Sequence, residues 1–226
     1  MVGLAGLLKV EEASYVFMGS YSRSVMSADM PYPDVAVGAK PSGVKTYFED
    51  VAALRSLKMV TLGSFPYYAA LAVPFAHAGS LYVSDVLAHP PVILSLSGVV
   101  GVFVYFIGYN IIANNRPFDI VKPKVDVIEG PFMECASKWR ALAYLMRGLV
   151  LFVPSSVFVT LYVGVPFDVT DPRLLAAHLA ASTMLPSLAA LMKAYSPVLT
   201  FRQIMPVSYR FTAVGLVAVG LAYMGV

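Results

Sequence analysis

The sequence is poor in the residues that build metal and redox sites. It has one cysteine, Cys135, and three histidines among 226 residues. A single cysteine forms no internal disulfide, and iron–sulfur clusters need several cysteine ligands. The sequence also lacks metal-ligand spacing, an interpretable Ser/His/Asp set and a glycine-rich phosphate loop. We therefore expect neither a metal site nor a catalytic residue in this chain.

Charged residues are scarce as well. They make up 13% of the sequence and hydrophobic residues make up 58%, whereas soluble domains have roughly 25% charged residues. This balance excludes an ordinary soluble domain, a disordered chain and a coiled coil, and it predicts an integral membrane protein. The first residues do not resemble a secretory signal, because Lys9, Glu11 and Glu12 interrupt the apolar run and no small-residue cleavage site follows.

Long apolar stretches predict the membrane spans. A spanning helix needs about 20 mostly apolar residues, and these stretches lack the two-residue alternation of a membrane β-barrel. We predict an all-α integral membrane protein of about five to six transmembrane helices, with a single membrane domain over residues 1–226. The strong candidates are residues 59–84, 91–114, 141–164, 174–194 and 208–226, and residues 1–19 are a weaker candidate.

The charges between these spans alternate along the chain. The segments 20–58, 115–140 and 195–207 carry eleven of the sixteen Lys and Arg residues. The segments 85–90 and 165–173 carry three aspartates against one arginine. Because basic loops tend to stay in the cytoplasm, the alternation predicts a multi-pass protein of the cell membrane with its three basic loops cytoplasmic.

The segment 115–140 combines nine charged residues with apolar turn elements. If only the charges are considered, a solvated cytoplasmic loop explains the segment. Pro117-Phe118 and Gly130-Pro131-Phe132 instead suggest an ordered loop folded back on the membrane, where charges pair and shift their pKa. The length of the segment also favours an ordered, functional loop.

The segment resembles a known signature. Pro117-Phe118-Asp119-Ile120, with Asp126, Gly130 and Glu134 at matching offsets, is similar to the loop of the quinone-site membrane subunit of respiratory complex I. It resembles even more the corresponding subunit of energy-converting membrane-bound NiFe hydrogenases. Ala53-Leu54-Arg55 followed by Pro66, and Phe201-Arg202-Gln203, resemble two further segments of the family.

The sequence departs from this family at several positions. Two loop glutamates of the family fall on Lys122 and Lys124, and a helix glutamate falls on Ser64. The family also has N-terminal helices that this sequence does not match. The resemblance therefore covers roughly residues 20–226. Three explanations for the missing first helices stay open: a separate chain that supplies them, a shortened gene product, or an ancestral loss.

The resemblance implies a membrane linker subunit that is not catalytic by itself. Such a subunit couples electron transfer in hydrophilic peripheral-arm subunits to proton or sodium translocation through antiporter-like membrane subunits. Iron–sulfur clusters, with a NiFe centre or a quinone, would then belong to partner subunits or to the interface with them. The expected partners are these subunits and the lipid bilayer. No nucleic-acid partner is expected.

The expected site residues fall into two groups. A carboxylate suits ion coupling, because burial raises its pKa and lets it exchange a proton when a neighbouring charge changes. The expected coupling residues are Asp119, Asp126, Glu129, Glu134, Lys122, Lys124, Glu11, Glu12 and Lys9. The expected contacts to the peripheral arm or a cavity are Arg55, Arg116, Pro117, Phe118 and Tyr67.

Several residues in the predicted spans have two alternative interpretations. Tyr67 and Tyr105 suit either the lining of a quinone-like cavity or, more often, packing. His77 and His178 suit either a proton relay or, more often, a hydrogen bond between helices. Two other functions also stay open: a stand-alone secondary transporter or channel, although no internal repeat is visible, and a non-pumping membrane anchor.

Overall fold

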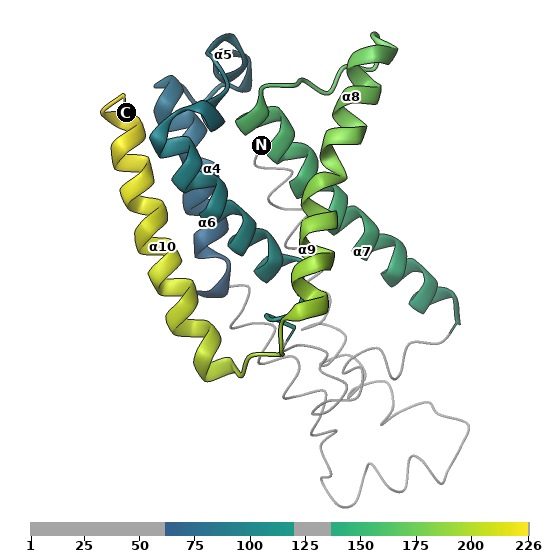
Figure 1. Ribbon diagram of the computed structural model, residues 1–226. Helices are drawn as coiled ribbons and strands as arrows, with labels where there is room; N and C mark the ends of the chain where they lie inside the picture. The colour runs from purple at the N-terminus through teal and green to yellow at the C-terminus, as the bar shows by residue number, and fades with distance from the viewer. Residues whose placement is uncertain (1–61, 120–136, 226) are drawn as a thin grey trace, which may run out of the picture. The chain divides into compact units, whose positions relative to one another are not determined.

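The structure is a computed structural model and describes residues 62–119 and 137–225. Every regular element within these ranges is a helix (Figure 1). The chain divides into two compact units, one of residues 1–60 and 119–147 and the other of residues 61–118 and 148–226. The predicted all-α class is confirmed for the described residues, and the single membrane domain stays a prediction.

Local sequence signals set the ends of helix α4 (Phe65–Ala78). Pro66 lies in its first turn, where the missing backbone N–H costs nothing. Gly79 ends the helix with φ 63°, a left-handed conformation that favours glycine, and donates its N–H to Ala76. The apolar run 59–84 is therefore not one helix, and the short helix α5 (Val83–Ala88) follows the turn.

Helices α4, α6 (Leu96–Ile112) and α10 (Phe201–Tyr223) pack against one another (Figure 1). The one-turn 3-10 helix η2 (Val92–Leu94) precedes α6. Glycines allow the close approach of the helices. A Cβ on Gly108 of α6 would lie 2.6 Å from the Tyr67 Cα of α4, and one on Gly215 of α10 would lie 2.9 Å from the Ala69 Cβ. Small residues at contacts of this kind are typical of membrane helices.

Two interrupted helical segments, α7 with η4 and α8 with α9, complete the described part of the second unit. The helix α7 (Ser137–Phe158), which begins in the first unit, continues as the π-helix η4 (Val159–Val163) and ends at Gly164 with φ 78°. The helices α8 (Pro172–Ser182) and α9 (Met184–Tyr195) are separated only by Thr183. Pro186 explains this break, because a proline ring clashes with the carbonyl four residues earlier.

The described helices differ in their capacity to cross a membrane. By length and composition alone, two stretches qualify, Pro172–Tyr195 and Arg202–Tyr223. The apolar helices Leu96–Ile112 and Gly148–Val163 are shorter. A helix overlaps each of the five strong candidate ranges, whereas the weaker candidate, residues 1–19, lies outside the described residues.

Candidate functional site

The chain turns sharply where α6 ends. Asn114 has φ 48°, in the left-handed region that asparagine tolerates better than most residues. The N–H of Asn115 donates to the carbonyl of Asn110 at 3.0 Å, and the N–H of Phe118 donates to the carbonyl of Asn115 at 2.7 Å. These hydrogen bonds define the shape of the start of the predicted signature loop.

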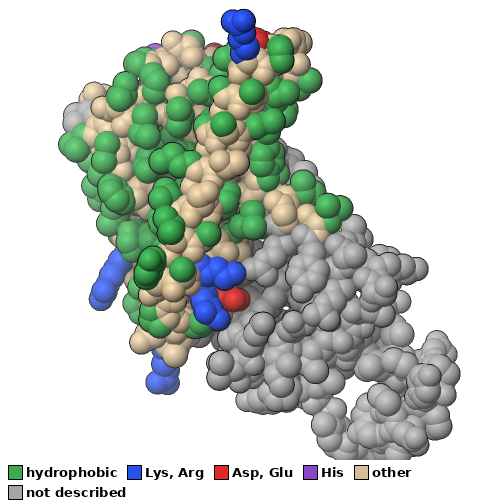
Figure 2. All heavy atoms as spheres, turned by 45° about the vertical axis from the view of Figure 1, so that its right-hand side comes forward, with side chains coloured by type: hydrophobic (Ala, Val, Ile, Leu, Met, Phe, Trp, Pro, Cys, Tyr) green, Lys and Arg blue, Asp and Glu red, His purple; other side chains and the backbone are tan. Residues whose placement is uncertain are grey.

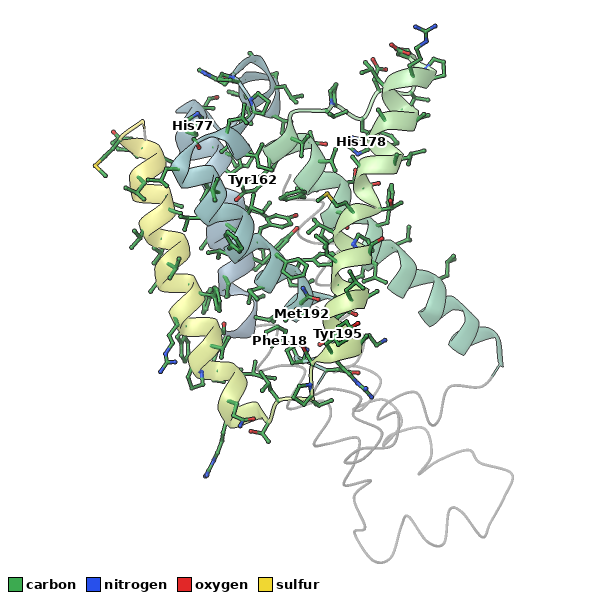
Figure 3. The ribbon with its side chains drawn as sticks, in the orientation of Figure 1. His77, Phe118, Tyr162, His178, Met192 and Tyr195 are labelled. Carbon is green, nitrogen blue, oxygen red and sulfur yellow. The ribbon has the colours of Figure 1, made fainter. Side chains whose placement is uncertain are left out.

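This turn is anchored to the connection between α9 and α10. The N–H of Leu199 donates to the carbonyl of Pro117 at 2.9 Å, and the Arg116–Pro117 peptide bond is cis. The Phe118 side chain is only 2% exposed, whereas that of Arg116 is exposed. Figure 3 shows Phe118 at the same end of the second unit as Tyr195 of α9. Segments from two of the predicted cytoplasmic loops therefore meet here.

Polar acceptors without donors lie beside the turn. The Asn110 side chain is fully buried and donates from Nδ2 to the Phe106 carbonyl at 2.8 Å. Its Oδ1 has no hydrogen-bond partner among the described residues, and neither has the Oδ1 of Asn114 or of half-buried Asp119. Buried polar atoms are normally hydrogen-bonded. These oxygens can accept from water or from a protonated group.

An aromatic core links α4, α6 and α7. Tyr67, Tyr105 and Tyr162 are each at most 1% exposed. The ring centroid of Tyr105 lies 5.1 Å from that of Tyr67, 5.6 Å from that of Tyr162 and 5.2 Å from that of Phe158. Such separations are favourable for aromatic pairs. Tyr67 is thus part of the core, and its predicted contact with a cavity stays a prediction.

The hydroxyl groups of this core have partners. The Tyr105 hydroxyl donates to the carbonyl of Pro154 at 2.7 Å and lies 3.3 Å from the Tyr67 hydroxyl. The Tyr162 hydroxyl donates to the carbonyl of Ala70 at 2.7 Å. Because a buried hydroxyl without a partner is costly, these bonds favour one arrangement of α4, α6 and the second half of α7.

His178 joins α8 to α7 and to the loop after η4. Its ring is fully buried, with Nε2 2.7 Å from the Ser156 hydroxyl and Nδ1 3.0 Å from the carbonyl of Val165. Because a carbonyl only accepts, Nδ1 carries the proton and Nε2 accepts from Ser156. His178 therefore connects α8 by hydrogen bonds to α7 and to the loop after η4. His77, near the end of α4, has a buried Nδ1 without a partner among the described residues.

Most exposed cations and the exposed aspartates of the second unit lie at opposite ends. Figure 2 shows Lys and Arg side chains at the end where α9 stops and α10 begins. The exposed cations near this end, at which the turn after α6 also lies, are Arg116, Lys193, Arg202 and Arg210. The connections at the other end carry Asp85, Asp168 and Asp171, with Arg173 at the start of α8. This separation agrees with the alternation of the predicted loops.

Asp168 lies in the acidic connection between η4 and α8. The hydroxyl and the backbone N–H of Thr170 donate to its Oδ1 at 2.7 and 2.8 Å. These hydrogen bonds hold the pKa of the Asp168 carboxyl below its usual range, because they stabilise the ionised form. The connection is therefore acidic and locally ordered.

The structure describes five of the predicted site residues. Arg116, Pro117 and Phe118 lie together in the turn, Asp119 follows them in the chain, and Tyr67 belongs to the aromatic core. The others lie outside the described residues: Lys9, Glu11, Glu12, Arg55, Lys122, Lys124, Asp126, Glu129 and Glu134.

Sequence reasoning missed three residues around the turn. Asn110 and Asn114 had a usable signal, since each is an amide near the end of an apolar run. Leu199 had none, because only the folded chain brings it to Pro117.

The chain is similar to proteins of membrane-bound respiratory systems. The family model described as NADH dehydrogenase matches residues 43–224. An uncharacterised protein of Methanocaldococcus jannaschii is 40% identical over 225 residues, which are 99% of this chain and 70% of that protein. An H-type NADH-quinone oxidoreductase subunit of Carboxydothermus hydrogenoformans is 28% identical over 115 residues, 50% of this chain and 33% of that protein.

A solved structure shares the fold. It is the membrane-bound sulfane sulfur reductase, described as an archaeal respiratory membrane complex. One of its chains matches with a TM-score of 0.70 at 15% identity, over 96% of this chain and 79% of that one. At this identity the match shows a common fold, and it extends beyond the range of the family model.

Proposed function

The chain belongs to the NADH dehydrogenase family of membrane oxidoreductase subunits, and from this premise we propose that it is the linker subunit of a complex I-like or membrane-bound hydrogenase-like complex. In this role it couples electron transfer in hydrophilic peripheral-arm subunits to proton or sodium translocation through antiporter-like membrane subunits. The observation that carries the proposal is the turn Arg116–Phe118. The turn buries Phe118, accepts a hydrogen bond from Leu199 and leads directly into Asp119.

The turn suits a site that responds to redox chemistry outside the chain. Buried Phe118 and the hydrogen bond from Leu199 to Pro117 hold the start of the loop against the helices. Arg116 is exposed, and in this proposal it would contact the peripheral arm. The loop that begins at Asp119 is then held at one end while its carboxylates exchange protons.

Carboxylates and lysines of the loop are the proposed coupling groups. Asp119, Asp126, Glu129 and Glu134 would gain or lose protons as the charge of a nearby redox site changes. Lys122 and Lys124 would act as their counter-ions, and Lys9, Glu11 and Glu12 would extend the path towards neighbouring subunits.

The redox groups belong to partner subunits in this proposal. Within residues 62–119 and 137–225, no three His, Cys, Asp or Glu side chains lie close enough to hold a metal ion. Iron–sulfur clusters, with a NiFe centre or a quinone, would supply the electron transfer from those partners or from the interface. In this proposal the chain itself positions the coupling residues, excludes water from them and moves protons.

The proposed setting is a multi-pass protein of the cell membrane with about five to six spanning helices. The cationic end around α9, α10 and the turn would face the cytoplasm, because Lys and Arg are retained there. The acidic connections at Asp85, Asp168 and Asp171 would face the other side. The separation of charges within the second unit supports this orientation.

Charge removal in the intact complex tests the function. Glu134→Gln and Asp119→Asn should each suppress ion translocation driven by the redox reaction while electron transfer and assembly persist. Asp85→Asn is the matched control, because Asp85 is exposed in the short helix α5 at the opposite end. Unchanged translocation in both loop variants would contradict the coupling role and favour a non-pumping anchor.

A further inference from the structure

The helices α8 and α9 follow one another as one interrupted column (Figure 1). Together they make up the stretch Pro172–Tyr195, whose 24 residues are long and apolar enough to cross a membrane. The interruption at Thr183 lies near the middle of this stretch. In the proposed membrane setting, the interruption therefore lies near the middle of the bilayer rather than at its surface.

The residues around the interruption weaken the helix locally. Pro186 has no N–H to donate to the carbonyl of Ser182, four residues earlier. Three hydroxyls donate to carbonyls three or four residues earlier, at 2.7 to 2.9 Å: those of Ser182, Thr183 and Ser187. Such side-chain bonds destabilise and bend helices slightly, and a proline is a common cause of a kink. Hinges consist of a few residues of this kind at the ends of elements.

Helix α8 is fixed to its neighbours on one side of the interruption. The His178 ring is fully buried, with Nε2 2.7 Å from the Ser156 hydroxyl of α7 and Nδ1 3.0 Å from the Val165 carbonyl. The ring also packs edge-on against Phe167, with 5.3 Å between the ring centroids. These contacts hold α8 to two separate segments of the chain.

Helix α9 is held at its two ends. Its buried side chains, Leu185 and Ala189, lie in its first half, whereas residues 190–195 are exposed or half-buried. Beyond the helix, the N–H of Leu199 donates to the carbonyl of Pro117 at 2.9 Å. At about 1.5 Å per residue, the 12 residues of α9 form an arm about 18 Å long. This arm connects the interruption to the turn Arg116–Phe118.

The two helices therefore have anchors of different kinds. Helix α8 is joined to α7, and the end of α9 is joined to the turn Arg116–Phe118, with Phe118 and Tyr195 at the same end of the second unit (Figure 3). Because the turn is hydrogen-bonded and Phe118 is buried, the turn moves as a packed element. A shift of the turn then displaces the end of α9, and the interrupted helix bends at its weakest point.

We propose that α9 is a lever that moves with the turn Arg116–Phe118 and pivots on residues 182–187, while His178 keeps α8 in place. The inference rests on the proposed function, because the force on the turn comes from the coupling loop that follows it. Pro186 is a positioning residue in this account. The lever links a change at the cytoplasmic surface to the middle of the bilayer.

Fluorine NMR of the intact complex tests the movement. Trifluoromethylphenylalanine replaces Leu191 of α9, Leu179 of α8 or Tyr209 of α10, which are three exposed positions. The signal from position 191 should shift between the oxidised and the reduced complex, whereas the signal from position 179 should not. The probe at 209 reports direct magnetic effects of the redox groups near the same end of the unit. An unchanged signal at 191, or equal shifts at 191 and 209, would overturn the proposal.

A change at Leu199 tests the link between the lever and the turn. Leu199→Pro removes the N–H that donates to Pro117 and should abolish the redox-dependent shift of the probe at position 191. Leu199→Ala is the matched variant, because it retains this N–H and should preserve the shift. A shift that persists in both variants would show that the hydrogen bond does not move α9.

Pro186→Ala tests the pivot. Alanine supplies the missing N–H and stiffens the helix, so the ratio of translocated ions to transferred electrons should fall about fivefold or more. The shift at position 191 should disappear as well. Pro206→Ala is the matched control and should leave the ratio unchanged, since Pro206 is an exposed proline within α10. A proline with only a structural role would alter assembly or the unfolding midpoint and leave the ratio intact, and that result would overturn the pivot.

Failure of the proposed function has a different signature. If the wild-type complex purifies with its partners and translocates ions, but the probe at position 191 does not respond to reduction, only the lever is wrong. If the tagged wild-type chain purifies without any partner, the linker function itself is wrong.

Discussion

The backbone N–H of Leu199 donates to the carbonyl oxygen of Pro117 at 2.9 Å. This hydrogen bond joins the turn after α6 to the connection between α9 and α10, across about eighty residues of sequence. It holds the turn at one of its ends while Phe118 buries its ring beside it. The start of the proposed coupling loop is therefore a packed element.

Removing the Phe118 ring should destabilise the protein. Truncation of a buried phenylalanine to alanine costs about 3–5 kcal/mol, because apolar contacts are lost and a cavity remains. The check is thermal unfolding of the detergent-solubilised protein for Phe118→Ala beside Phe103→Ala, whose ring is 67% exposed in α6. Equal midpoints for the two variants would contradict the packing of the turn.

A methyl group on Gly108 should force α4 and α6 apart. The added Cβ would lie 2.6 Å from both Cα and N of Tyr67, which are backbone atoms that cannot rotate away. Overpacking of this kind costs about 1–3 kcal/mol. Gly148→Ala is the matched control, because a Cβ there meets nothing within 4 Å. Thermal unfolding should show a lower midpoint for Gly108→Ala alone, and a lower midpoint for both would argue against this close approach.

Loss of the Ser156 hydroxyl should leave the buried His178 Nε2 without a donor. An unsatisfied buried polar atom costs about 1–3 kcal/mol, so Ser156→Ala should lower the unfolding midpoint. Ser187→Ala is the control, because its exposed hydroxyl bonds only to the Thr183 carbonyl one turn away. Nitrogen NMR of labelled histidine should show His178 protonated at Nδ1. The opposite tautomer would contradict the hydrogen bonds assigned to His178, from Nδ1 to the Val165 carbonyl and from the Ser156 hydroxyl to Nε2.

Asp168 should titrate below an ordinary aspartate. The depressed pKa means that its hydrogen bonds with Thr170 contribute stability above the unfolded-state pKa, and that this contribution is lost as the pH falls through the folded-state pKa. Carboxyl-carbon NMR of labelled aspartate, assigned with Asp168→Asn, measures the value directly. Thr170→Val should raise the pKa of Asp168 towards its usual range, and an unchanged pKa would show that Thr170 is not the cause.

The fold class was predictable because apolar stretches encode helices strongly, but the ends of the helices were less so. The last helix begins at Phe201 rather than near residue 208, because the Gln203 carboxamide accepts the Thr200 N–H at 2.9 Å and starts the helix early. The stretch 174–194 is divided at Thr183 by Pro186, and the stretch 59–84 ends its main helix at Gly79. Each signal is local and was visible in the sequence.

The candidate site was predictable only in part. Pro117, Phe118 and Asp119 were found through their resemblance to a family signature. The hydrogen bond from Leu199 and the orphan oxygens of Asn110 and Asn114 depend on tertiary contacts that no local pattern encodes.

The most direct test of the central claim is the set of subunits that purify with this chain. A tagged chain, expressed at its natural level and extracted in mild detergent, should emerge with hydrophilic subunits that contain iron–sulfur clusters and with antiporter-like membrane subunits. Mass spectrometry and iron content measure both. A chain that emerges alone or as a homo-oligomer, without iron and without such partners, would contradict the account and favour a stand-alone transporter.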